Sequence, residues 1–212
     1  MTDNKDVKIG GLLLAAGGSS RLGQPKQLLQ FQGKTLLRRA VETLVSSECM
    51  PVVVVLGAEI DKSQAEIAEI SVNISINNDW RTGMSSSIKT GLKELLNIEP
   101  NLAAVIITLC DQPYITVGKI DLFTAEFYRN GATIIAAKYG ETVGVPALFS
   151  RELFDELLHL EGDKGARDLI RNRTKVSTIK LDEAAFDIDT SGAFENLMIS
   201  VNLNADKADW AD

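Results

Sequence analysis

The chain has 212 residues, of which 45% are hydrophobic, enough to bury one sizeable core, and we expect a single domain over residues 1–212. Its formal net charge of −7 argues against a nucleic-acid-binding surface. No apolar stretch approaches the roughly 20 residues that span a bilayer, and the polar first six residues do not resemble a signal peptide. We therefore expect a cytoplasmic protein with no nucleic-acid or membrane partner.

Strand-like apolar runs alternate with helical ones along the chain. Strands are predicted over residues 9–15, 52–57, 72–76, 103–109, 132–137, 148–149 and 176–181. Helices are predicted over residues 36–45, 64–70, 85–96, 117–128, 151–160, 166–171 and 194–203. This alternation predicts a three-layer α/β/α sandwich around a mostly parallel sheet, in which ligands bind beyond the carboxyl ends of the strands.

The first predicted strand ends in the small residues 15–20, which include Gly17 and Gly18. Glycines let the backbone approach a ligand closely, and consecutive N–H groups can bind an anion. Arg21 and Lys26 follow near enough to close over bound phosphates. A Gly-rich turn with two solvated cations is the alternative, and we favour phosphate binding. The spacing matches neither the G-x-G-x-x-G nor the Walker pattern.

Carboxylates mark two further candidate positions. Asp111 directly follows the apolar residues 105–110, where it could hold Mg²⁺ or form a local turn, and the residues alone do not separate these hypotheses. Asp187 and Asp189 would face the same side of a strand, or they belong to a solvated turn before a helix. The single His159 and two cysteines cannot build a usual zinc site, so any metal here should be held by carboxylates and phosphate.

Residues 77–87 join a predicted strand to a predicted helix and contain three consecutive serines. Serines at a helix start supply capping oxygens, and the helix start also exposes backbone N–H groups. Ordinary capping explains one serine well but not three.

Residues 14–29 read LAAGGSSRLGQPKQLL. They match, at every defined position, the signature L-A-A-G-x-S-x-R-[ML]-G-x-x-K-x-L-L of the nucleotidyltransferases related to molybdenum cofactor cytidylyltransferase. Five further segments resemble motifs of that family: GMSSS at 83–87, DQP at 111–113, GVPALF at 144–149, GDKGAR at 162–167 and DIDT at 187–190. The resemblance covers most of residues 9 to 190 and implies the Rossmann-like nucleotide-diphospho-sugar transferase fold.

The resemblance also implies roles for individual residues. Nucleotide binding is assigned to Ala15, Ala16, Gly17, Gly18, Ser19, Lys26, Ser85, Ser87 and, more weakly, Asn78. The catalytic residues are Arg21, Lys26 and Asp111. Asp111 and Asp189 are expected to hold Mg²⁺ or Mn²⁺, with Asp187 as the reserve choice for the second ligand. The second substrate is assigned to Gly144, Pro146 and Arg167. The family continues its second carboxylate segment with Thr-Pro-Glu-Asp, whereas here Thr190 is followed by Ser191.

The implied reaction is attack of a terminal phosphate of molybdopterin on the α-phosphate of CTP, with release of pyrophosphate. We expect a monomer whose product serves a molybdoenzyme of the xanthine dehydrogenase type. The Leu-Ala-Ala-Gly sequence resembles the cytidylyl branch, whereas the guanylyl branch usually carries Leu-Ala-Gly-Gly. A guanylyltransferase, or a transferase using another NTP or another phosphorylated acceptor, is therefore the alternative.

Two alternatives come from other classes. An oxidoreductase with a dinucleotide site is disfavoured because no G-x-G-x-x-G follows the first strand. A non-catalytic molybdenum cofactor carrier could keep the nucleotide loop but would not need both metal carboxylates.

Overall fold

The computed structural model describes residues 7–18, 25–163 and 165–186. Its strands are β1 (Ile9–Ala15), β2 (Gln30–Phe31), β3 (Lys34–Thr35), β4 (Val52–Leu56), β5 (Asn73–Ile76), β6 (Ala104–Leu109), β7 (Ile134–Tyr139), β8 (Thr142–Ser150) and β9 (Ser177–Lys180). Its α-helices are α1 (Leu36–Val45), α2 (Ile60–Ile67), α3 (Met84–Ile98), α4 (Val117–Asn130), α5 (Phe154–Leu158) and α6 (Arg167–Arg171). Short 3-10 helices lie at Lys26–Leu28, Trp80–Thr82, Arg151–Leu153 and Asp182–Ala185. The helix predicted over residues 194–203 lies outside the described residues.

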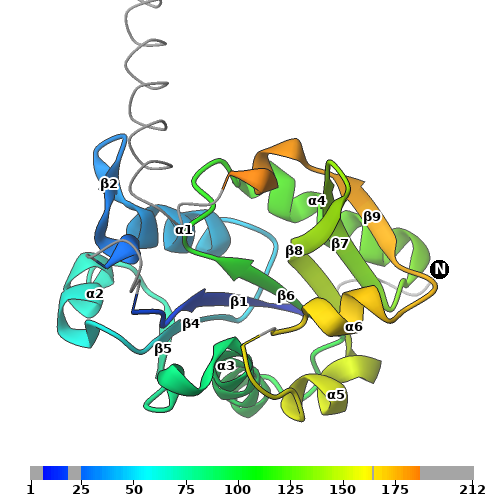
Figure 1. The fold of residues 1–212 in the computed structure, drawn as a ribbon, viewed down its shortest axis with the longest axis horizontal. Coiled ribbons are helices and arrows are strands. Elements are labelled where there is room, and N and C mark those ends of the chain that lie inside the picture. The colour runs from blue at the N-terminus through cyan, green and yellow to red at the C-terminus, as the bar shows by residue number, and fades with distance from the viewer. Residues whose placement is uncertain (1–6, 19–24, 164, 187–212) are drawn as a thin grey trace, which may run out of the picture.

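Seven strands form one sheet in the order β5-β4-β1-β6-β8-β7-β9 (Figure 1). Strand β1 pairs in parallel with both β4 and β6, so that Leu12 lies opposite Val53 on one side and Ile107 on the other. Strand β8 runs antiparallel to both of its neighbours, β6 and β7. The predicted mostly parallel sheet is therefore confirmed, with one reversed strand inside it.

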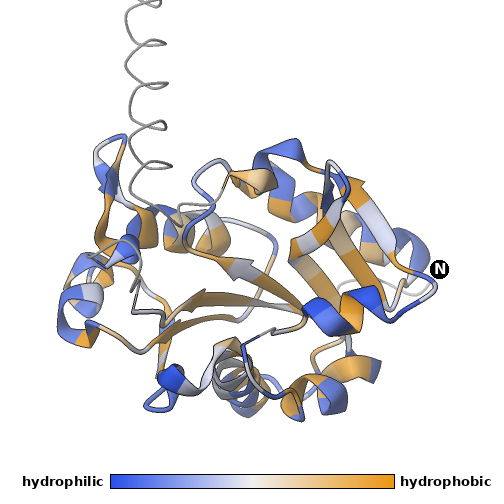
Figure 2. Ribbon diagram, in the orientation of Figure 1, coloured by the Kyte–Doolittle hydropathy of each residue, from blue (hydrophilic) through white to orange (hydrophobic). Residues whose placement is uncertain are grey.

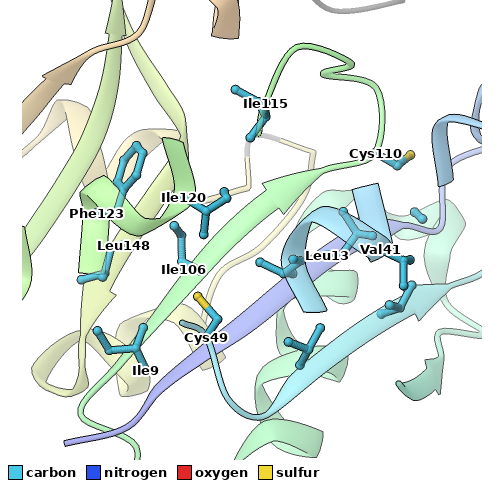
Figure 3. Close-up of a cluster of buried hydrophobic side chains, with 14 of the residues drawn as sticks. Ile9, Leu13, Val41, Cys49, Ile106, Cys110, Ile115, Ile120, Phe123 and Leu148 are labelled. Atoms are coloured by element: carbon cyan, nitrogen blue, oxygen red, sulfur yellow. The ribbon is translucent and has the colours of Figure 1, made fainter. Parts of the chain in front are cut away.

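Helices cover both faces of the sheet, which confirms the three-layer prediction. On one face, Leu13 and Ile106 pack with Val41 of α1 and Phe123 of α4 (Figure 3). On the other face, the alternate strand residues pack against α3, α5 and α6. Because successive strand residues point to opposite faces, a strand buried on both sides reads as a continuous apolar run. Figure 2 shows these apolar strands in the middle and hydrophilic colouring concentrated on the helices and loops around them.

Two segments differ from the sequence prediction in a way that concerns the site. The sequence predicts only a short strand at 148–149, but residues 142–150 form the nine-residue strand β8. A tight turn after Tyr139, with Gly140 at φ +54°, returns the chain along β7 as a hairpin. The register of the β7–β8 pair shifts between Ala136 and Ala137, which accommodates Pro146 in the strand although proline cannot donate to the ladder.

Helix α2 begins at Ile60, four residues before the predicted start at 64, and the predicted helix at 151–160 is divided into a 3-10 turn and α5. The short hairpin of β2 and β3 was not predicted. Among the described residues, no helix is long and apolar enough to cross a bilayer.

Candidate active site

A pocket of about 330 Å³ lies beyond the carboxyl ends of β1 and β6, where a parallel sheet is expected to bind its ligand. Seven of the residues assigned from the sequence line it: Ala15, Ala16, Gly17, Gly18, Lys26, Ser87 and Asp111. Nine others complete the lining: Leu14, Gln27, Trp80, Arg81, Gly83, Met84, Leu109, Cys110 and Asp163. The fold therefore brings the Gly-rich turn, the serine helix and Asp111 together, although they are separated by up to about a hundred residues in the sequence.

The Gly-rich turn packs against an indole ring. A Cβ atom added at Gly18 would lie 2.7 Å from Cη2 of Trp80, and one added at Gly57 would lie 2.8 Å from the carbonyl oxygen of Ala16. The guanidinium carbon of Arg81 lies 4.4 Å from the ring centroid of Trp80, within cation–π range. Sequence patterns did not assign Trp80 to the site, since a single aromatic residue near a loop is usually a packing residue.

Asp111 is 4% exposed and forms an ion pair with Lys26, whose Nζ donates to its Oδ2 atom. In the described part of the chain, the buried Oδ1 atom has no hydrogen-bond partner. Leaving a buried carboxylate oxygen unpaired is costly, so this atom is available to a ligand of the site. The described residues contain no cluster of three or more His, Cys, Asp or Glu side chains that could hold a metal by themselves.

The thiol of Cys110 also lines the pocket, but it is not a nucleophile. Burial, together with the negative charge of Asp111, raises the pKa of Cys110 to about 12. The thiol is therefore protonated at neutral pH, and it offers neither a thiolate nucleophile nor a thiolate metal ligand.

The start of α3 supplies another part of the lining. Ser87 lines the pocket, and its Oγ accepts a hydrogen bond of 2.9 Å from Nδ2 of Asn77. Ser85 is buried outside the lining, and Asn78 is exposed. Neither asparagine lines the pocket, but Asn77 contacts a residue that does, and the role of Asn78 stays a prediction. Asn77 directly follows strand β5, but the sequence did not show which of the two asparagines turns inward.

A loop of the second half of the chain forms the rim near α3. Asp163 lines the pocket, and a Cβ atom added at Gly83 would lie 2.6 Å from its Oδ1 atom. The N–H of Ser85 donates to the carbonyl oxygen of Gly162 over 3.2 Å, which attaches the loop to the helix start. Glycine at position 83, with φ +115°, is required both by this contact and by its backbone conformation.

The residues assigned to a second substrate do not line the pocket. Pro146 is buried in β8, Gly144 is partly buried in the same strand, and Arg167 is exposed at the start of α6. Their roles stay predictions from the resemblance. Ser19, Arg21, Asp187 and Asp189 lie outside the described residues.

Gln112 links the Asp111 turn to the last described helix. Its Nε2 atom donates to the carbonyl oxygens of Val145, over 3.0 Å, and Ala184, over 2.9 Å. The side chain is buried, so these hydrogen bonds hold the turn against β8 and against the helix at Asp182–Ala185. The sequence motif identified Asp111 but gave no separate role to the glutamine that follows it.

Comparisons with known proteins identify the family. The MobA-like NTP transferase domain matches residues 11–178. Nicotine blue oxidoreductase of Paenarthrobacter nicotinovorans is 38% identical over 113 residues, covering 50% of this chain and 51% of that protein, so the match spans about half the length of this relative. A probable molybdenum cofactor guanylyltransferase of Bacillus cytotoxicus is 24% identical over 176 residues, covering 82% of this chain and 85% of the relative.

Solved structures agree with this assignment. The Rv0371c homologue from Mycobacterium sp. strain JC1 is 34% identical, with a TM-score of 0.80 over 91% of this chain and 96% of that one. Rv0371c of Mycobacterium tuberculosis in complex with manganese is 26% identical, with a TM-score of 0.76 over 92% of this chain and 100% of that one. Since the family match covers most of the sheet and includes the Gly-rich turn, the serine helix and Asp111, the chain belongs to the MobA-like NTP transferase family.

Proposed function

We propose that this protein transfers CMP from CTP to the phosphate of molybdopterin, with release of pyrophosphate. The observation that carries the proposal is that the Gly-rich turn and the Lys26–Asp111 pair line the same pocket. Family membership supports a nucleotidyltransferase activity. The relative named as a probable molybdenum cofactor guanylyltransferase supports the acceptor, and the Leu-Ala-Ala-Gly sequence favours cytidine.

The donor chemistry at Asp111 fits a hard divalent cation. Its buried Oδ1 atom, which has no hydrogen-bond partner among the described residues, is an oxygen ligand of the kind that Mg²⁺ and Mn²⁺ prefer. We infer that Asp111 and Asp189 would hold Mg²⁺ or Mn²⁺ together with the substrate phosphates, and the manganese complex of Rv0371c supports this inference. When bound, such a cation neutralises charge on the triphosphate and orients it.

The side chains of this protein would act through position and charge. The turn at residues 15–18 brings backbone close to the nucleotide, and Lys26, with Arg21, would stabilise negative charge on the α-phosphate and the leaving pyrophosphate. No general base is required, because a phosphate nucleophile is already ionised near neutral pH. The catalysed step therefore depends on holding two anionic substrates in line, as in other phosphoryl transfers.

The test is pyrophosphate release with Mg²⁺ or Mn²⁺, comparing CTP, GTP, ATP and UTP with and without molybdenum cofactor. Release that needs both CTP and the cofactor supports the proposal. Release with GTP instead would identify a guanylyltransferase using the same pocket. Nucleotide binding without release, with the cofactor present, would favour the carrier hypothesis.

One relative favours a second candidate function. The 38% identity to nicotine blue oxidoreductase over half of the chain raises an oxidoreductase activity, although the chain has no G-x-G-x-x-G after β1. Fluorescence titration with NADH separates the two candidates, because a nucleotidyltransferase pocket has no requirement for a nicotinamide. Tight NADH binding together with no pyrophosphate release would overturn the transferase proposal.

We further infer that the enzyme acts as a monomer in the cytoplasm and that its product serves a molybdoenzyme of the xanthine dehydrogenase type.

A further inference from the structure

Asn77 is a buried amide whose hydrogen bonds are all made inside the protein. It is 2% exposed and directly follows β5. Its Oδ1 atom accepts from the backbone N–H of Asp79 over 3.0 Å, and its Nδ2 atom donates to Oγ of Ser86 over 2.8 Å and to Oγ of Ser87 over 2.9 Å. Because a backbone N–H can only donate, Asp79 fixes which end of the amide is the oxygen. Both N–H groups of Asn77 must therefore face the two serines.

The two serines differ in what they do with their own hydroxyl protons. The single hydroxyl proton of Ser86 is shared between two acceptors, the carbonyl oxygens of Gly83, at 2.8 Å, and Asp79, at 3.1 Å. Ser87 accepts from Asn77, and among the described residues its own hydroxyl donates no hydrogen bond. A serine hydroxyl carries one proton, so Ser87 has a donor to offer while its orientation is set by Asn77.

Ser87 is also the one of these two serines that lines the pocket. It lines the pocket beside Met84 and Gly83, whereas Ser86 is not among the lining residues. We propose that Asn77 is a positioning residue that holds Ser87 as a hydrogen-bond donor toward an acceptor atom of the bound nucleotide. The inference rests on the proposed nucleotide site. It adds that, in one contact of that site, the protein donates the hydrogen bond and the nucleotide accepts it.

Because Ser87 donates, the site favours ligands that place a hydrogen-bond acceptor opposite its hydroxyl. A carbonyl oxygen, a ring nitrogen with a lone pair or a ribose oxygen can accept the proton of Ser87. An N–H group at the same place would meet a donor, and one of the two would be left without a partner in a buried wall. Sites that hydrogen-bond a substrate group discriminate against ligands that lack the matching group, because their own polar atom is then left unpaired.

Exchange of Asn77 for aspartate tests the direction of the hydrogen bond from Ser87 with little change of shape. In Asn77→Asp, one carboxylate oxygen can still accept from the N–H of Asp79, but the other accepts where the amide donated. The hydroxyl of Ser87 would then turn its proton toward position 77 and away from the ligand. We expect Kd for CTP, measured by calorimetric titration with Mg²⁺, to rise about tenfold, the effect of one hydrogen bond of about 1.4 kcal/mol.

A double-mutant cycle separates positioning from general damage. Ser87→Ala should weaken CTP binding to a similar extent, and adding Asn77→Asp to it should cause little further loss, because the donor is already gone. KM for CTP should rise in these variants more than kcat falls. Additive losses, or an unchanged Kd in Asn77→Asp, would overturn the inference.

Ser86→Ala is the matched control, because it removes a hydroxyl that also accepts from Asn77 but has no donor to spare. It should bind CTP as the wild type does. Asn101→Asp adds the same charge at an exposed position before β6 and should also leave binding unchanged. If Asn77→Asp does not fold, the comparison of Ser87→Ala with Ser86→Ala decides the question by itself, and equal affinities would overturn the inference.

Failure of the Asn77–Ser87 inference can be told apart from failure of the proposed transfer reaction. A wild-type protein that binds CTP but transfers nothing to molybdopterin leaves the contact testable by titration and removes only the proposed reaction. A wild-type protein that binds no nucleotide overturns both.

Discussion

At the scale of single residues, the site depends on a buried carboxylate with one satisfied and one unsatisfied oxygen. Lys26 satisfies Oδ2 of Asp111, while Oδ1 has no partner among the described residues. Asp111→Asn keeps the size of the side chain but removes its charge. We expect the variant to fold and to lose about 10³-fold in kcat for pyrophosphate release, the scale of one electrostatic group in an active site.

Metal binding gives a second measurement on the same variant. Electron paramagnetic resonance of Mn²⁺ should show weaker binding in Asp111→Asn than in the wild type when CTP is present. Asp155→Asn, at an exposed position on α5, removes the same charge and should change neither quantity. Normal turnover and normal Mn²⁺ affinity in Asp111→Asn would contradict the metal assignment.

The two thiols give a prediction that depends on pH. Burial is the main cause that raises the pKa values of both Cys49 and Cys110 from 9.0 to about 12. In the folded protein at pH 8, about one thiol in ten thousand would be ionised. Neither cysteine should react with iodoacetamide at pH 8 until the protein is unfolded, and mass spectrometry of labelled native protein measures this. Labelling of Cys110 in the native state would show that its thiol is accessible and acidic.

The raised pKa values of the two thiols also make the free energy of unfolding depend on pH. Because folding raises these pKa values, the folded state favours the protonated thiols, and the contribution is fully present below about pH 9. It is lost as the pH rises from about 9 toward 12, where the unfolded chain releases protons that the folded chain retains. The free energy of unfolding should therefore fall across this alkaline range.

At the scale of elements, helix α3 lies close against the sheet because it carries a glycine there. A Cβ atom added at Gly91 would lie 2.2 Å from Cδ1 of Leu12 and 2.7 Å from Cγ2 of Val55. Alanine is favoured over glycine in a helix by about 1 kcal/mol, but overpacking costs about 1–3 kcal/mol. We expect Gly91→Ala to lower the free energy of unfolding, measured by urea denaturation.

Gly118 of α4 is the matched control. It is exposed, and a Cβ atom added there has no neighbour within 4 Å. Gly118→Ala should therefore stabilise the protein by about 0.4–1 kcal/mol, since only the helix preference remains. If both substitutions changed stability in the same direction, the close contact of α3 with the sheet would not be what requires Gly91.

Most strands could be predicted from the sequence, because strands that are buried on both faces consist of consecutive apolar residues. The bounds of β1 agree with the prediction, and those of β4 and β6 differ by one residue. Strand β8 could not be found in the same way. Gly144 and Pro146 are ordinary turn signals, and only the register shift in the β7–β8 pair makes room for them in a strand.

The site residues that belong to a sequence motif could be predicted. Those whose role depends on how a side chain is oriented in the folded protein could not. The Gly-rich turn, Lys26, Ser87 and Asp111 were assigned from motifs, and all line one pocket. Asn77 and Trp80 were missed because their contributions come from contacts between distant segments. The buried amide of Asn77 meets a helix about ten residues away, and the indole of Trp80 meets the turn at Gly18.

At the scale of the whole molecule, we expect a monomer. The exposed large hydrophobic residues of the described chain are Val45, Met50, Met84, Ile98, Leu122 and Phe186. They come from several elements, and the two on α3 lie at opposite ends of a 15-residue helix. Scattered apolar residues of this kind are normal on monomers. Sedimentation equilibrium should give a mass near 23.0 kDa, and a concentration-dependent dimer mass would contradict the expectation.

The reversed strand β8 has a consequence for biosynthesis. Strands β5, β4, β1 and β6 are all complete once residue 109 has been made, but β6 receives its second neighbour only when residues 142–150 follow. Residues 110–141 take about 2–6 s to synthesise at about 5–20 residues per second. Throughout that time a sheet assembled from those four strands would present an apolar, unpaired edge of the kind that pairs with other chains. The distance between β6 and β8 along the sequence therefore sets how long each growing polypeptide is exposed to aggregation on the ribosome.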